Sequence, residues 1–187
     1  MNYELFIKKM KLSVKNMWFP EPINKTMDEL FKIPQVREQF DQGWDYSGDL
    51  RPRAIKISPG YWPAQKVLDV LPDPKKDVYL ILTGMNLKGD FGRIHGRGCE
   101  RRAIISSDGF VNGDGILWEV SFSATAFGEI GHALGLKHHE YNSRNPCEMS
   151  HNEIPGPDWK KIEKVRLCKS CYAKLRNSKG LDQIISK

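Results

Sequence analysis

The segment 127–139, FGEIGHALGLKHH, contains residues that bind metal ions, at spacings that suit one site. Residues four apart on a helix lie on one face, about 5–6 Å apart at their Cβ atoms, so a pattern H-E-x-x-H lets two histidines share one zinc ion. Glu129 and His132 fit that pattern, but its first position is Gly128. A glutamate at position 129 would be placed to take a proton from a zinc-bound water.

A further ligand can follow the helix if the chain turns sharply. Gly135 is the residue type that adopts the left-handed conformation such a turn needs, and His138 is then spaced to return to the metal. The shortened pattern E-x-x-H-x-x-G-x-x-H is only moderately specific, so ordinary helix and loop histidines remain an even alternative. The more C-terminal residues shift this balance toward a metal site.

A second set of metal-binding residues follows. Cys168 and Cys171 form the pair CKSC, whose spacing places both thiols on one side of a helix. His139 and Cys147 complete a set of one imidazole and three thiolates, which suits a closed, tetrahedral, structural zinc site. A redox pair is the alternative, but it is expected near a strand-to-helix junction early in a βαβ unit, and that context is missing.

The remaining cysteine and histidines have weaker claims to a role. Cys99 has no partner nearby in sequence and is expected to be a half-buried core or loop residue. His95 and His151 are expected at the surface. His151 follows Cys147 closely enough to be kept as a replacement ligand.

Composition indicates one folded domain over residues 1–187. Hydrophobic residues make up 40% of the chain and charged residues 28%, both ordinary for a globular protein of 187 residues. Lysine and arginine number 29 against 23 aspartates and glutamates, but both signs interleave along the chain. This favours a solvated surface over a dedicated binding patch.

No targeting or membrane segment is apparent. Residues 1–18 lack an uninterrupted apolar run and a small-residue cleavage site, and no segment approaches the roughly 20 apolar residues that span a bilayer. We therefore expect a cytoplasmic protein without membrane contact. In that compartment the four cysteines favour metal binding over disulfides.

Helices and strands are expected to alternate, which predicts an α/β or α+β domain with a mixed, mostly parallel sheet. The first residues, 1–18, are of uncertain type. Apolar periodicity and breakers predict helices at 24–40, 64–71, 116–136 and 157–178, strands at 53–58, 78–87 (central) and 101–110, and a turn or hairpin at 88–98.

These C-terminal motifs resemble the archaemetzincins, a branch of the metzincin zinc peptidases. That family has H-E-x-x-H-x-x-G-x-x-H-C, a few residues, C-x-M, a spacer of under twenty residues, and C-x-x-C. This chain has GEIGHALGLKHH, seven residues, CEM, eighteen residues and CKSC. Upstream, the segments GYWPAQKVLDVL, VYLILTGMNL and GCERRAIISS resemble the family's helix, central strand and edge strand.

The resemblance implies a function for several residues. Glu129 would be the general base, and His132 and His138 would bind a catalytic zinc. Met149 would belong to the turn beneath that metal, a role compatible with a core methionine. His139, Cys147, Cys168 and Cys171 would hold the structural zinc, in a subsite within 139–171, tied to a C-terminal helix.

The chain departs from the family pattern in three places. His139 replaces a cysteine, which is conservative because imidazole also binds zinc. The gap from His139 to Cys147 is longer than usual, which predicts a bulging loop. Gly128 removes one catalytic ligand and, at about 1 kcal/mol below alanine in helix propensity, is not explained by helix formation. The site would then hold zinc weakly, recruit His151, or use Glu129 itself as a ligand, which would abolish hydrolysis.

Three functions are consistent with these patterns. The first is a zinc metallopeptidase that hydrolyses peptide or protein substrates. The second is a pseudo-peptidase that keeps the structural zinc and binds peptides without cutting them. The third, ranked low, is a zinc-stabilised nucleic-acid-binding module, whose basic residues would be Lys160, Lys161, Lys164, Arg166, Lys169, Lys174 and Arg176. Neither substrate preference nor oligomeric state can be read from the sequence.

Overall fold

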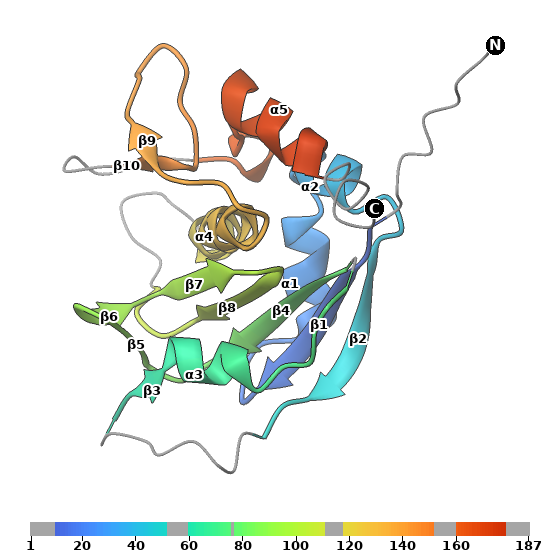
Figure 1. The fold of residues 1–187 in the computed structure, drawn as a ribbon, viewed down its shortest axis with the longest axis vertical. Coiled ribbons are helices and arrows are strands. Elements are labelled where there is room, and N and C mark those ends of the chain that lie inside the picture. Colours follow the sequence, from blue (N-terminus) through green and yellow to red (C-terminus); the bar gives the residue numbers. More distant parts are fainter. Residues whose placement is uncertain (1–9, 52–59, 76, 111–117, 152–159, 179–187) are drawn as a thin grey trace, which may run out of the picture.

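Five strands of the described chain form the central sheet. The computed structural model describes residues 10–51, 60–75, 77–110, 118–151 and 160–178, with only the backbone at 151 and 178 (Figure 1). The strands are β1 (Leu12–Met17), β2 (Trp44–Asp49), β4 (Val78–Thr83), β7 (Gly96–Cys99) and β8 (Arg102–Ser106), in the order β2-β1-β4-β8-β7. All neighbours are parallel except β7, which runs antiparallel to β8 at the edge. The predicted mixed, mostly parallel sheet is confirmed.

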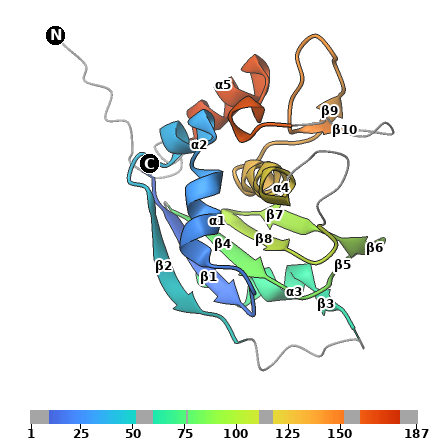
Figure 2. The ribbon, with the colours of Figure 1, turned by 180° about the vertical axis from the view of Figure 1, so that it is seen from behind.

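The two faces of the sheet are covered by different elements (Figures 1 and 2). On one face, Leu80 and Leu82 of β4 pack in the larger core with α1 (Ile23–Leu30) and α4 (Trp118–Ala133). On the other, Ile81 packs in a smaller core with α3 (Ala64–Asp69), the helix predicted at 64–71. Burial on both faces explains the continuous apolar run of the predicted central strand.

The glycine-rich segment 88–98, predicted as a turn or hairpin, contains most of a hairpin. The chain then continues into the main sheet. β5 (Leu87–Gly89) and β6 (Gly92–Ile94) form the antiparallel hairpin, which joins β3 (Trp62–Pro63) in a three-stranded sheet. The chain then forms β7. The edge strand on this side of the sheet is therefore β7. The prediction of an edge strand at 98–107 is wrong for most of that segment, because β8 lies inside the sheet between β4 and β7 and only Gly98 and Cys99 belong to the edge.

The predicted helix 24–40 is two helices. α1 ends before Phe31, and α2 (Pro34–Gln39) begins with a proline at its first position. Proline disfavours helical geometry in the preceding residue, and Ile33 has an extended conformation with φ −69° and ψ 115°. Pro34 therefore separates the two helices.

The predicted helix 157–178 is also shorter than expected. Of its described part, Ile162–Lys164 is one 3₁₀ turn, and α5 covers Lys169–Ser178. The backbone before α5 is held by other elements: the Leu167 N–H donates to Gln35 Oε1 of α2 at 2.6 Å, and the Arg166 carbonyl accepts from the Glu148 N–H at 3.0 Å. These tertiary bonds replace the bonds that a longer helix would need.

The described helix α4 (Trp118–Ala133) lies within its predicted span of 116–136, and the chain leaves it as expected at Gly135. Gly135 has φ +87°, its N–H donates to the His132 carbonyl at 2.9 Å, and the Leu136 N–H donates to the Gly131 carbonyl at 2.9 Å. This pair of bonds is the Schellman motif, which needs a left-handed residue at that point. The turn sends the chain back along the helix.

Other parts of the chain were not predicted or lie outside the description. The segment of uncertain type contains β1, and β2 was not predicted because WDYSGD has few β-forming residues. The strand predicted at 53–58 lies outside the described residues. Among the described helices, none combines the length and the apolar character that crossing a bilayer requires.

β7 lies directly against the backbone of α4. A Cβ on Gly98 would lie 1.9 Å from the Glu129 carbonyl oxygen, and one on Gly96 would lie 2.6 Å from Glu129 Cγ. Real side chains do not approach so closely, so the strand and helix would have to separate to admit them. The two glycines of β7 therefore permit this contact.

Gly98→Ala should destabilise the protein by about 1–3 kcal/mol or more, because the new methyl group would overlap helix backbone. Its melting temperature should fall by about 2–4 °C per kcal/mol. Gly128→Ala is the matched control, since a Cβ there meets its nearest neighbour at 3.4 Å and helix propensity improves. Equal melting temperatures for the two variants would contradict the close packing of β7 on α4.

Candidate metal centres

The turn at Gly135 brings His132 and His138 together. Their Nε2 atoms are 3.0 Å apart, and their rings are roughly perpendicular with centroids 4.5 Å apart. His132 is half-buried in the last turn of α4, and His138 is exposed. The predicted pairing of these histidines is thus present in the fold.

The backbone fixes which nitrogen of His132 is available. Its Nδ1 lies 3.0 Å from the Leu136 carbonyl, which can only accept, so Nδ1 carries the proton. In the neutral imidazole Nε2 then holds a lone pair, 3.0 Å from Nε2 of His138, so one proton is shared between these two nitrogens. A metal ion bound by both Nε2 atoms would displace that proton, as is usual when imidazoles become ligands.

Glu129 lies on α4 beside the edge strand. Its half-buried side chain contacts Gly96, and its carboxylate accepts a hydrogen bond from the Gly98 N–H. Burial raises its pKa to about 7, with a smaller increase from Glu148, while Arg97 and the Gly98 bond oppose the shift. A carboxylate with this pKa can exchange protons near neutral pH.

Glu148 covers the position of the missing histidine. A Cβ on Gly128 would lie 3.4 Å from Glu148 Cγ and 3.6 Å from its Oε1. A histidine side chain at position 128 would therefore lie against the side chain of Glu148. Glu148 has no role predicted from the sequence, where the only available signal is its place between Cys147 and Met149.

Met149 packs beneath the last turns of α4. It is fully buried, and its Sδ lies 2.8 Å from where a Cβ on Gly131 would be. Its carbonyl accepts from the His139 N–H at 3.0 Å, beside the parallel pair β9 (His139–Glu140) and β10 (Ser150–His151). This contact holds the segment after His138 against the 147–149 turn.

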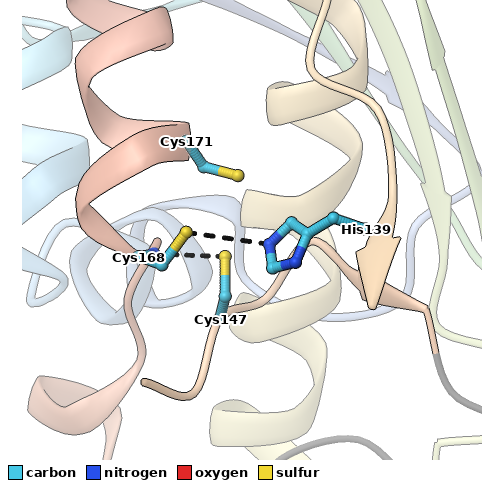
Figure 3. A group of neighbouring side chains, drawn as sticks. All are labelled: His139, Cys147, Cys168 and Cys171. Atoms are coloured by element: carbon cyan, nitrogen blue, oxygen red, sulfur yellow. Dashed lines mark hydrogen bonds between the residues drawn. The ribbon is translucent and has the colours of Figure 1, made fainter. Parts of the chain in front are cut away.

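The second predicted set of ligands forms a compact group (Figure 3). The ligand atoms of His139, Cys147, Cys168 and Cys171 all lie within 4.8 Å of one another. The His139 Nδ1–H donates to the Glu140 carbonyl at 2.8 Å, which leaves Nε2 facing the thiols. This donor set suits a tetrahedral zinc ion, whose bonds to sulfur and nitrogen are about 2.0–2.3 Å.

The environment of the thiols differs within the group. Burial raises the pKa of Cys147, and burial together with the neighbouring Cys147 raises that of Cys171 to about 12. Burial also acts on Cys168, but hydrogen bonds from the Cys171 and Ser170 backbone at the start of α5, and from the other two thiols, leave its pKa lowered. Without metal the group thus holds protons that zinc would displace.

The other predicted residues do not complete a catalytic set. Among the described residues, the His139 group is the only one with three or more histidine, cysteine or acidic ligand atoms within 4.8 Å of one another. His151 has its backbone in β10, and its side chain lies outside the description. Cys99 is half-buried on β7 as expected, and His95 is exposed and packs on Phe110.

Solved structures share this arrangement of sheet and helices. Archaemetzincin from Methanopyrus kandleri superimposes with a TM-score of 0.68 at 21% identity, over 91% of this chain and 96% of that one. Archaemetzincin from Archaeoglobus fulgidus gives 0.64 at 22% identity, over 88% and 99%. The chain has the archaemetzincin fold. A zinc-dependent peptidase from Methanocorpusculum labreanum is also similar, with a TM-score of 0.61 at 15% identity over 89% of this chain and 99% of that one. No protein-family model and no curated protein matches the sequence.

Within the archaemetzincin fold, the three departures have distinct structural settings. His139 lies in the four-residue group, so its imidazole occupies a ligand position beside the thiols. The longer segment before Cys147 is an exposed loop that extends away from the body of the domain (Figure 1). Gly128 lies on α4 next to Glu148, which a methyl group at 128 would just touch and which an imidazole there would have to displace.

Cys171→Ser should remove one tightly bound zinc per chain and destabilise the fold. Structural zinc contributes about 10–16 kcal/mol of apparent binding free energy in small zinc peptides, so a loss of several kcal/mol is expected. Elemental analysis and thermal unfolding measure the two effects. Cys99→Ser is the control, because Cys99 lies outside the group. Unchanged zinc content in Cys171→Ser would contradict the assignment.

Glu129→Gln should change how stability depends on pH in protein freed of weakly bound metal. The unfolded chain releases this proton near pH 4.5, whereas the folded protein keeps it until about pH 7. The carboxyl therefore destabilises the folded state progressively between these values, and the variant should gain stability over the wild type from pH 5 to pH 8. Glu163→Gln, at an exposed site, is the control. Parallel stability profiles for wild type and Glu129→Gln, measured by urea unfolding, would exclude the raised pKa.

Proposed function

We propose that this protein is a zinc-dependent peptidase of archaemetzincin type. The observation that carries the proposal is the pair of Nε2 atoms of His132 and His138, 3.0 Å apart, with Glu129 one helical turn before His132. We further propose that residues 1–187 act as one domain in the cytoplasm. It would hold one structural zinc at the His139 group and a second, catalytic zinc at the two histidines.

The two histidines and Glu129 have complementary roles in this proposal. When bound, zinc polarises a peptide carbonyl and makes a nearby water more acidic. His132, held by its bond to Leu136, and His138 bind and orient the ion. Glu129 takes a proton from the attacking water and returns it to the leaving amine, and its pKa of about 7 suits both transfers.

The position of β7 at the edge of the sheet supports the proposal that the substrate is a peptide or protein. β7 is the last strand of the sheet and lies beside Glu129. An extended peptide can add to a sheet edge through main-chain hydrogen bonds, which do not depend on its side chains. A substrate strand along β7 would place its backbone close to Glu129.

Glu129→Gln should abolish peptide hydrolysis while leaving the fold intact. General-base catalysis contributes about 10²–10⁴-fold, and the amide cannot accept the proton. Cleavage of a fluorogenic peptide library measures the effect, with Glu163→Gln as a control of equal charge change. Hydrolysis at the wild-type rate in Glu129→Gln would exclude the proposed base.

A pseudo-peptidase is a second candidate, and Gly128 favours it. Catalytic zinc sites normally have three protein ligands, and loss of one lowers metal affinity. Such a protein would keep the His139 zinc and bind peptides without cleaving them. Gly128→His separates the candidates: a gain in both zinc content and cleavage would indicate a degraded native site, and unchanged activity would indicate that another residue already fills the place.

A further inference from the structure

Position 128, where the family pattern has a histidine, lies next to the side chain of Glu148, to which the sequence patterns assign no function. We infer that Glu148 supplies the third protein ligand of the proposed catalytic zinc, in place of a histidine at position 128. The inference rests on the proposed function, because it assumes that His132 and His138 hold a metal ion.

The distances at Gly128 support this exchange of ligands. Glu148 Oε1 lies 3.6 Å from the position of a Cβ on Gly128. This is about as far as the Nε2 of a histidine lies from its own Cβ. The carboxylate oxygen therefore lies about as far from this Cβ position as the Nε2 of a histidine at 128 would. Glu148 Cγ, at 3.4 Å, also occupies volume that an imidazole there would need.

The backbone that carries Glu148 is held on both sides. Its N–H donates to the Arg166 carbonyl at 3.0 Å, Cys147 belongs to the four-residue metal group, and Met149 is buried under α4. In the described conformation the carboxylate does not form a compact group with the two histidines. The main chain of Glu148 is thus fixed beside α4, and binding the ion would require its carboxylate to turn from its present contacts toward the two histidines.

The chemistry of the resulting set is suited to catalysis. Two histidines and one glutamate are a known catalytic zinc set that keeps an open position for water. A ligand from Glu148 would leave Glu129 as the base, whereas a ligand from Glu129 would remove it. An imidazole at 128 would compete with the side chain of Glu148 for the same space, whereas glycine does not.

The first experiment measures zinc binding to Glu148→Gln. Wild type should bind two zinc ions per chain, and the variant should keep the first while its second binds at least about 10-fold more weakly in a competition with a chromogenic chelator. Cobalt in place of zinc should show altered absorption bands at that site. Glu163→Gln is the matched control, and thermal unfolding checks that every variant is folded. Wild-type affinity for the second zinc in Glu148→Gln would overturn the inference.

The second experiment exchanges the two residues. Gly128→His combined with Glu148→Ala should restore tight binding of the second zinc, whereas Glu148→Ala alone should lose it. If His151→Gln weakens the second zinc and Glu148→Gln does not, His151 is the third ligand and the inference is wrong. If wild type and the exchanged variant both bind a single zinc, the proposed function fails. If the exchanged variant binds two while Glu148→Gln matches wild type, only the inference fails.

Discussion

The close packing at glycines on two sides of α4 is the constraint on which the proposed site depends. On one side, β7 approaches so closely that Gly98 has no room for a Cβ, and this places Glu129 at the edge of the sheet. On the other, Gly131 lets Met149 pack against the helix. Because neither glycine carries a side chain at its contact, small changes at these glycines would displace the residues that carry the proposed chemistry.

The two candidate metal centres are linked because neighbouring residues in the chain contribute to each of them. His138 lies beside His132 at the proposed catalytic position, and the next residue, His139, belongs to the four-residue group. Glu148 lies beside Gly128, and the residue before it, Cys147, belongs to the same four-residue group. The bond from the His139 N–H to the Met149 carbonyl joins these two segments. A zinc ion at the four-residue group would therefore fix the main chain next to His138 and Glu148, which would pre-organise the proposed catalytic ligands.

Some of the sequence-based expectations failed where tertiary contacts replaced local ones. The helix predicted before Cys168 does not form because Gln35 and Glu148 bind the backbone that it would use. The helix predicted at 24–40 is interrupted at Pro34, a local signal that apolar periodicity outweighed. β2 has few β-forming residues and forms because β1 offers it a partner.

The sequence by itself determined the candidate metal ligands, the turn at Gly135 and the buried central strand, because each depends on residue types at short, regular spacings. It also led to the archaemetzincin fold. Only the tertiary structure decided which strand forms the edge beside Glu129 and what lies over Gly128. Glu148 is twenty residues from Gly128 in the chain. Their contact depends on the path of the intervening loop and on the packing of the 147–149 turn, which no local pattern encodes.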